Sequence, residues 1–125
     1  MEVVVPHAQG VPLLGELPAG VHVTVATAPA DSDVEFWVPP FLRAAADILA
    51  RLPRLRVVQL LTAGADAWIG RVPGHVTLCT ARGVHTSSTS EWAVAAMLGY
   101  LREFPGFARA QARGEWTQQI GRAHV

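Results

Sequence analysis

The sequence predicts an α/β domain with a parallel, doubly wound sheet of five strands and a long helix near the C-terminus. Five short, valine-rich apolar runs are bounded by proline, glycine or polar residues, as strands usually are. Each run is followed by a helical or irregular segment long enough for a parallel crossover. Half of the 125 residues are hydrophobic, so the chain can bury a core, and disorder is excluded as its main state.

The first three strands are expected in the N-terminal third of the chain. Glu2–Val5 is a strand that the following proline ends. Residues 7–20 are rich in glycine and proline and leave room for one short helix. Val21–Val25 alternates valine with other residues and predicts the second strand. Val34–Val38 predicts the third, which two prolines stop.

Two helices and two further strands are expected in the middle of the chain. Phe41–Leu52 is alanine-rich with one apolar face and predicts a helix. Arg56–Leu61 is almost continuously apolar, as strands buried on both faces of a parallel sheet are. Gly64–Gly70 predicts a helix of about two turns, and His75–Cys79 predicts the fifth strand. These elements together favour a flavodoxin-like architecture.

A long helix is expected from Ser88 to about Arg102, where Pro105 breaks it, and a further helical stretch is expected to reach Arg113. Within it, Trp92–Leu101 carries no charge. A helix that is apolar all round is normally buried all round, which predicts a partner domain or subunit. The alternative is a hydrophobic helix with a few exposed apolar residues.

Composition excludes several classes of protein. The formal net charge is zero and no basic patch is evident, so no nucleic acid partner is expected. No apolar run approaches the length of a membrane span, and the N-terminus lacks the basic start of a signal peptide. We therefore expect a soluble, cytoplasmic protein without a membrane partner. The single cysteine, Cys79, excludes a disulfide framework, and no metal site is predicted.

The segment most suggestive of chemistry is Thr62–Asp66, where a predicted buried strand enters a turn of small residues. Gly64 lets a ligand approach the backbone, and free N–H groups there would attract an anion. Ligands of open α/β sheets bind at the carboxyl ends of strands, where this turn lies. The residues alone favour an ordinary strand-to-helix turn capped by Asp66, and a carboxylate-binding loop is the alternative.

The remaining candidate side chains carry no predicted role. His7 and His85 are expected in solvated loops, and Cys79 is expected as an inert buried thiol. Three tryptophans are expected in the core rather than in a stacking platform: Trp37, Trp68 and Trp92.

Three motifs, taken in order, are similar to those of one enzyme family. A strand enters Thr62–Asp66, a valine-containing strand leads to Thr80–Gly83, and a helix begins near Thr89–Glu91. Their order and spacing resemble the N-terminal, substrate-binding part of the D-isomer-specific 2-hydroxyacid dehydrogenases, which show Ser-Ala-Gly-x-Asp, Asn-Ala/Pro-x-Gly and Thr/Val-Ala-Glu. The resemblance extends from Met1 to about Trp116.

The resemblance implies reduction of 2-oxo acids, or oxidation of D-2-hydroxy acids, with NAD or NADP. It implies that amides around Ala63, Gly64 and Ala65 hold the substrate carboxylate, and that Thr89 lies near the nicotinamide. The family's catalytic Arg, Glu and His and its glycine-rich dinucleotide turn lie downstream, so no catalytic residue is assigned here. The departures include Thr62 for the usual Ser, which keeps the hydroxyl group.

The expected domain organisation is a substrate-binding fragment with its linking helix, residues 1–118, and a non-native tail, residues 119–125. Residues Ile120–Val125 are similar to the translation of a common sequencing-library adapter, so we expect this tail to be a read-through artefact. The resemblance implies a cofactor held mainly by a missing domain, a homodimer when full-length, and a fragment that is inactive alone. The alternative is a standalone flavodoxin-like module that binds a carboxylate without catalysis.

Overall fold

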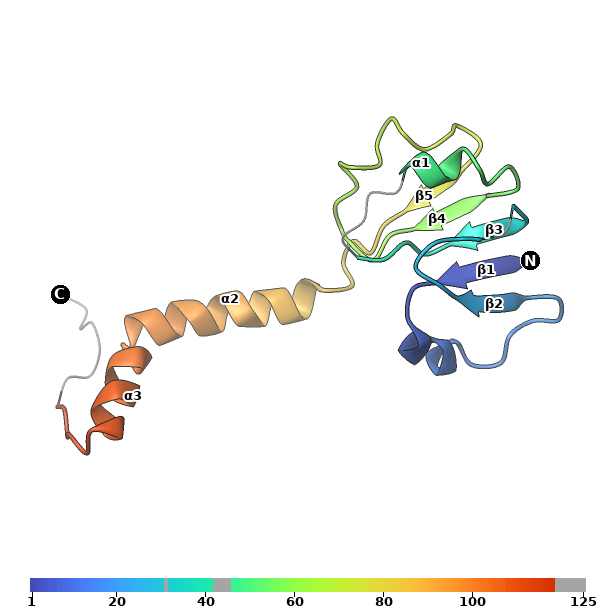
Figure 1. The fold of residues 1–125 in the computed structure, drawn as a ribbon. Helices are drawn as coiled ribbons and strands as arrows, with labels where there is room; N and C mark the ends of the chain where they lie inside the picture. The colour runs from blue at the N-terminus through green and yellow to red at the C-terminus, as the bar shows by residue number, and fades with distance from the viewer. Residues whose placement is uncertain (31, 42–45, 119–125) are drawn as a thin grey trace. The chain divides into compact units, whose positions relative to one another are not determined.

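The computed structural model of the chain describes residues 1–30, 32–41 and 46–118 (Figure 1). The chain divides into two compact units, Met1–Val84 and His85–Val125. The predicted non-native tail, residues 119–125, lies outside the described residues.

The first unit is built on a five-stranded sheet in which every neighbouring pair of strands is parallel. The strand order is β2-β1-β3-β4-β5, and all arrowheads in Figure 1 point the same way. This is the order of flavodoxin-like, doubly wound sheets, so the predicted α/β fold is confirmed. The strands are β1 (Glu2–Val5), β2 (His22–Val25), β3 (Val34–Trp37), β4 (Val57–Gln59) and β5 (Thr77–Cys79).

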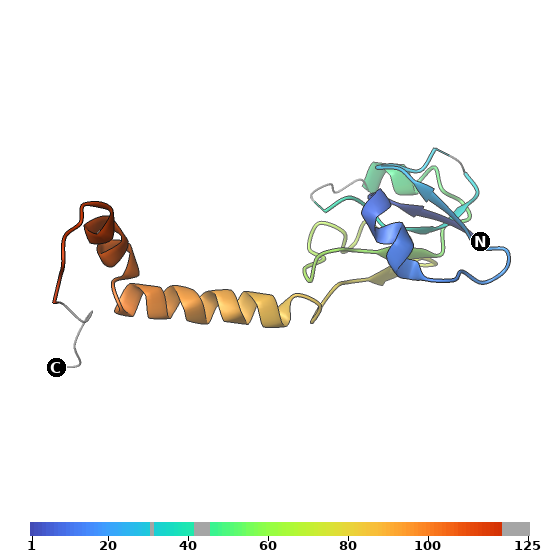
Figure 2. The same ribbon diagram turned by 90° about the horizontal axis from the view of Figure 1, so that it is seen from below.

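Within the described residues, two of the connections between strands contain a helix. The 3₁₀-helix η1 (Ala8–Leu14) joins β1 to β2 and is in the foreground of Figure 2. Helix α1 (Ala46–Leu49) precedes β4. Residues 42–45 of the helix predicted over Phe41–Leu52 lie outside the described residues, and the described part ends three residues before Leu52.

The prediction of a helix over Gly64–Gly70 is wrong, because the segment forms successive turns. The carbonyl of Ala65 accepts hydrogen bonds from the N–H groups of Trp68 and Ile69. The carbonyl of Trp68 accepts them from Arg71 and Val72, but the described structure gives no such bond to the carbonyls of residues 66 and 67, so the turns do not join into a helix. Gly70 has a φ of 76°, which no right-handed helix adopts. A segment this short gains too few hydrogen bonds to offset helix nucleation.

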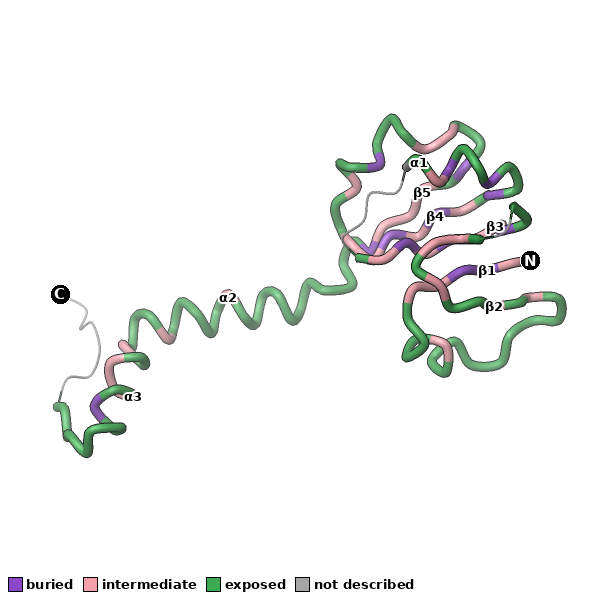
Figure 3. Tube along the Cα trace, in the orientation of Figure 1, coloured by how far each residue is buried: buried purple, intermediate pink, exposed green. Residues whose placement is uncertain are grey.

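The core of the first unit is made by side chains from β1, β3, β4 and the segments beside them (Figure 3). The side chains of Trp37, Val58, Leu55 and Leu60 are each no more than 2% exposed. Trp37 meets Trp68 edge to face, with ring centroids 5.9 Å apart and an interplanar angle of 72°. The predicted core positions of these two tryptophans are confirmed.

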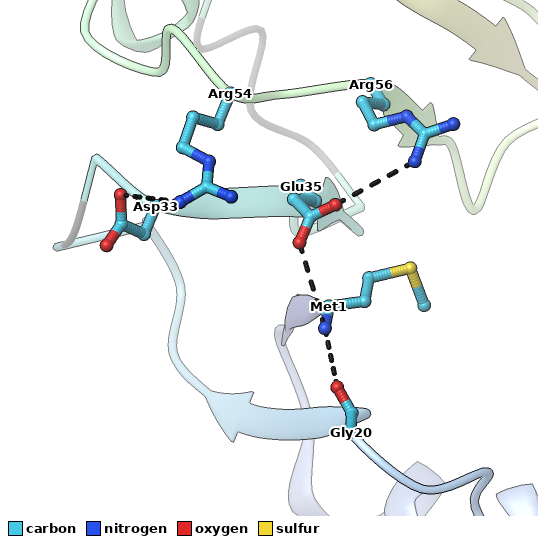
Figure 4. Close-up of polar contacts among 6 residues, drawn as sticks. All are labelled: Met1, Gly20, Asp33, Glu35, Arg54 and Arg56. Carbon is cyan, nitrogen blue, oxygen red and sulfur yellow. Dashed lines mark hydrogen bonds and ion pairs between the residues drawn. The ribbon is translucent and has the colours of Figure 1, made fainter.

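Ion pairs lie between the strands at the amino end of the sheet (Figure 4). The carboxylate of Glu35 lies 3.7 Å from the amino group of Met1 and 3.9 Å from the guanidinium of Arg56. Asp33 and Arg54 pair at 3.5 Å, and both side chains are largely exposed. Exposed pairs of this kind contribute little to stability, so apolar packing dominates the stability of this unit.

The second unit contains α2 (Thr86–Leu101) and α3 (Phe104–Ala112), so the helices predicted from Ser88 to Arg113 are confirmed. Glu103, with a φ of 53°, separates them just before Pro105. No residue of α2 is buried, and the side chain of Trp92 is 72% exposed, so its predicted core position is wrong. The described residues contain no helix long and apolar enough to span a membrane.

At the end of α3, the guanidinium of Arg113 donates a 2.6 Å hydrogen bond to the carboxylate of Glu115. This bond lowers the pKa of Glu115 and raises the pKa of Arg113, and weak desolvation opposes both shifts. Because the pKa of Glu115 is lower in the folded chain, the pair stabilises the folded state at pH values above the carboxyl's unfolded pKa. This stabilisation is lost as the pH falls through the folded pKa.

The substitution Arg113→Gln is therefore expected to return the pKa of Glu115 toward its ordinary value. Arg109→Gln, a matched change on an exposed residue of the same helix, is expected to leave it unchanged. Titration of the Glu115 side-chain carbon resonance by NMR measures both. Equal pKa values of Glu115 in the two variants would contradict the conclusion that Arg113 causes the shift.

Truncation of the core is expected to destabilise the first unit far more than truncation of its surface. Leu60→Ala removes a side chain that is 2% exposed and should lower the free energy of unfolding by about 2–5 kcal/mol. Leu13→Ala makes the same change at a side chain that is 86% exposed and should alter it by less than about 0.5 kcal/mol. Urea denaturation measures both; similar midpoints would contradict this description of the core.

Candidate functional site

The candidate site is the 62–66 loop, which leaves the carboxyl edge of the sheet after β4. Pairing between β4 and β5 continues beyond the strands themselves. The N–H of Leu60 donates to the carbonyl of Cys79 at 2.8 Å, and the N–H of Ala81 donates to the carbonyl of Thr62 at 2.9 Å. The start of the loop is therefore fixed to the sheet.

Two further hydrogen bonds fix the shape and the end of the loop. The hydroxyl of Thr62 donates to the carbonyl of Gly64 at 2.7 Å. The N–H of Trp68 donates to the carbonyl of Ala65 at 2.8 Å. The buried Trp68 ring then packs edge to face on Trp37, which anchors the loop's exit to the end of β3.

Between these anchors lie three consecutive N–H groups, those of Ala63, Gly64 and Ala65. Over the described ranges of the chain, none of them donates to a backbone or side-chain acceptor. Ala63 and Gly64 are exposed, and Ala65 is partly buried against the core. Backbone N–H groups need an acceptor, so these three are satisfied by water or by a ligand.

Chemically, a run of unpaired N–H groups in a turn suits an anion, because each group presents a fixed partial positive charge. A helix beginning in the loop, as the sequence predicts, would add to this attraction through its dipole. No helix follows, so the amides themselves must supply it.

Gly64 permits close approach of a ligand to this backbone. Its φ is not in the left-handed region, and a Cβ placed on it would meet Oδ2 of Asp66 at 3.3 Å. The backbone conformation therefore does not require glycine here, and the missing Cβ leaves the backbone open to a ligand. Asp66, expected as a helix cap, caps no helix, and its carboxylate lies beside the loop instead.

The other predicted site residue, Thr89, lies in the first turn of α2 in the second unit. Its side chain is exposed, and its N–H donates to the carbonyl of His85 at 3.1 Å. The three loop residues thus share one segment, whereas Thr89 belongs to the other unit and can offer a ligand only its hydroxyl group.

The remaining candidates agree with the sequence analysis except for the cysteine. His7 and His85 are exposed, as expected for loop residues. Cys79 is partly exposed, so the prediction of a buried thiol is wrong; it lies near the end of edge strand β5. No group of metal-ligating side chains occurs within the described residues.

A hollow elsewhere in the first unit offers a competing site. It has a volume of about 320 Å³, and its polar lining residues are Glu2, Thr24, Ser32 and Asp33. Its lining among the described residues includes two carboxylates and no cation, so a negatively charged ligand is disfavoured there. The 62–66 loop remains the better anion site.

No family model and no curated protein matches the chain. Solved structures do match it. A D-isomer-specific 2-hydroxyacid dehydrogenase family protein from Aeromonas salmonicida aligns with 98% of this chain and 42% of its own, at 20% identity and a TM-score of 0.80. A second such dehydrogenase, from Xanthobacter autotrophicus in complex with NADPH and MES, aligns with 98% of this chain and 43% of its own. The sequence identity is 21% and the TM-score is 0.66. A glycerate dehydrogenase related protein from Thermoplasma acidophilum aligns with 97% of this chain and 42% of its own. The sequence identity is 19% and the TM-score is 0.62.

These matches confirm, at the level of fold, the resemblance that the motifs indicate. The chain has the fold seen in part of the D-isomer-specific 2-hydroxyacid dehydrogenases, and the alignment takes in nearly all of its residues. The chain spans less than half the length of each of these structures.

The Thr62 hydroxyl is expected to hold the loop in shape. Thr62→Val removes the donor to the Gly64 carbonyl and should lower the free energy of unfolding by about 1 kcal/mol. Thr62→Ser keeps the donor and should retain the loop order. Amide hydrogen exchange at Ala63–Asp66 should be faster in the valine variant alone. Equal exchange in both variants would show that the hydroxyl does not organise the loop.

Proposed function

We propose that the chain is the substrate-binding part of an NAD(P)-dependent oxidoreductase that interconverts 2-oxo acids and D-2-hydroxy acids. In this proposal the N–H groups of Ala63, Gly64 and Ala65 bind the substrate carboxylate. The observation that carries it is the run of three unpaired amides at the carboxyl edge of β4. The fold match to 2-hydroxyacid dehydrogenases supports the reaction class.

The nicotinamide cofactor would be held mainly by a part of the protein outside this chain. The Xanthobacter autotrophicus neighbour is a complex with NADPH, which supports this class of cofactor and leaves the choice between NAD and NADP open. Among the described residues, no glycine-rich turn between a strand and a helix is present to cradle a pyrophosphate. We propose only that the Thr89 hydroxyl lies near the nicotinamide when the cofactor is bound.

The proposal makes this chain a binding part and not a complete catalyst. In this proposal the catalytic acid, base and carbonyl-polarising arginine lie outside this chain, so the chain alone should be inactive. The longer protein would supply these groups and, by the family resemblance, would be a homodimer in the cytoplasm.

Extension of the reading frame tests the reaction class. We expect the gene to continue beyond the codon for Gln118 into a strand and a G-x-G-x-x-G turn, with Arg, Glu and His motifs further on. The longer protein should then oxidise NADH or NADPH with glyoxylate or pyruvate, whereas residues 1–118 should not. A reading frame without these motifs would contradict the proposal of an oxidoreductase. It would favour the alternative, a standalone module that binds a carboxylate without catalysis.

Affinity for oxamate, a 2-oxo acid analogue, tests the loop itself. Gly64→Ala adds a methyl group where the ligand must approach, and should weaken oxamate binding at least tenfold. The unfolding free energy should change by less than about 1 kcal/mol, because the Asp66 side chain can move. Isothermal titration calorimetry measures the affinity.

The matched control is Gly74→Ala, since a Cβ on Gly74 would meet no atom within 4 Å and its φ is not positive. This variant should bind oxamate as the original chain does. Equal affinities in the two alanine variants would contradict a ligand site at Gly64.

A further inference from the structure

The carboxylate of Asp66 lies beside the unpaired amides of the 62–66 loop. Asp66 is exposed, and its Oδ2 atom lies 3.3 Å from the position that a Cβ on Gly64 would occupy. An anion held by the Gly64 N–H therefore binds within about one Debye length of this negative charge, which is about 10 Å at 0.1 M salt.

No cation neutralises this carboxylate within the described part of the chain. The ion pairs there use Asp33, Glu35 and Glu115 as acids, and Asp66 takes part in none of them. It also makes no hydrogen bond among those residues. The loop thus combines three N–H donors with one uncompensated negative charge.

We infer that Asp66 is a specificity-determining residue that makes the loop selective for singly charged carboxylates. This inference rests on the proposed function, in which the loop amides hold the ligand carboxylate. The amides attract one carboxylate by short-range hydrogen bonds, which outweigh one repulsion from Asp66. A second negative charge on the ligand adds repulsion and gains no further donor, so dianions are rejected.

The substitution Asp66→Asn tests this inference with two probes of similar size, oxamate (one charge) and oxalate (two charges). Removal of the Asp66 charge should tighten oxamate binding by about threefold and oxalate binding by about tenfold at low salt. The difference between the two gains should shrink in high salt, because the effect is electrostatic. Calorimetry of the original chain and the variant gives the four dissociation constants.

Two further variants keep the test decisive. Asp66→Ser removes the same charge without introducing an amide, and it should raise the affinity for oxalate more than that for oxamate, as Asp66→Asn does. It serves as the test if the asparagine variant does not fold well. Asp33→Asn removes an exposed charge just before β3, at the opposite edge of the parallel sheet, and should leave the oxalate-to-oxamate ratio unchanged.

The outcomes separate the inference from the proposed function. If the original chain binds oxamate but neither Asp66 variant changes the oxalate-to-oxamate ratio, the inference alone is overturned. If the original chain and all variants bind neither anion, the carboxylate-binding function itself fails, and the inference fails with it.

Discussion

The hydrogen bond from the Ala81 N–H to the Thr62 carbonyl is the constraint on which the candidate site depends. It extends the β4–β5 pairing beyond the strands and holds the first residue of the loop at the sheet. The Thr62 hydroxyl then holds the carbonyl of Gly64, and the Trp68 ring, packed on Trp37, holds the exit. With both ends fixed, three N–H groups in between are left without an acceptor among the described residues, although no helix follows to orient them.

Most of the fold could be predicted because parallel strands leave a strong signal. Apolar, β-branched runs such as Val57–Gln59 can be buried on both faces, and prolines and glycines mark their ends. The segment after Gly64 was predicted wrongly because apolar content alone cannot distinguish a short helix from turns packed on a core. The prediction that Trp92 is buried is wrong for a related reason. Hydrophobicity predicts that a side chain favours burial, but not whether residues of the same chain bury it.

The site could be predicted only in part. The run of small residues pointed to the 62–66 loop, and the family motif assigned the substrate carboxylate to Ala63, Gly64 and Ala65. It could not show which N–H groups lack acceptors, because that depends on the bonds that Thr62 and Trp68 make around them. Asp66 was interpreted as a helix cap, since a carboxylate after a glycine turn usually serves that purpose. Its place beside Gly64 became evident only from the structure.

The most direct test of the central claim, that the amides of the 62–66 loop bind a carboxylate, is an NMR titration of the ¹⁵N-labelled chain with oxamate. The largest shifts should occur at the N–H resonances of Ala63, Gly64 and Ala65, with the sheet residues unchanged. Saturable shifts confined to another segment, or no saturable shift in this loop, would contradict the claim.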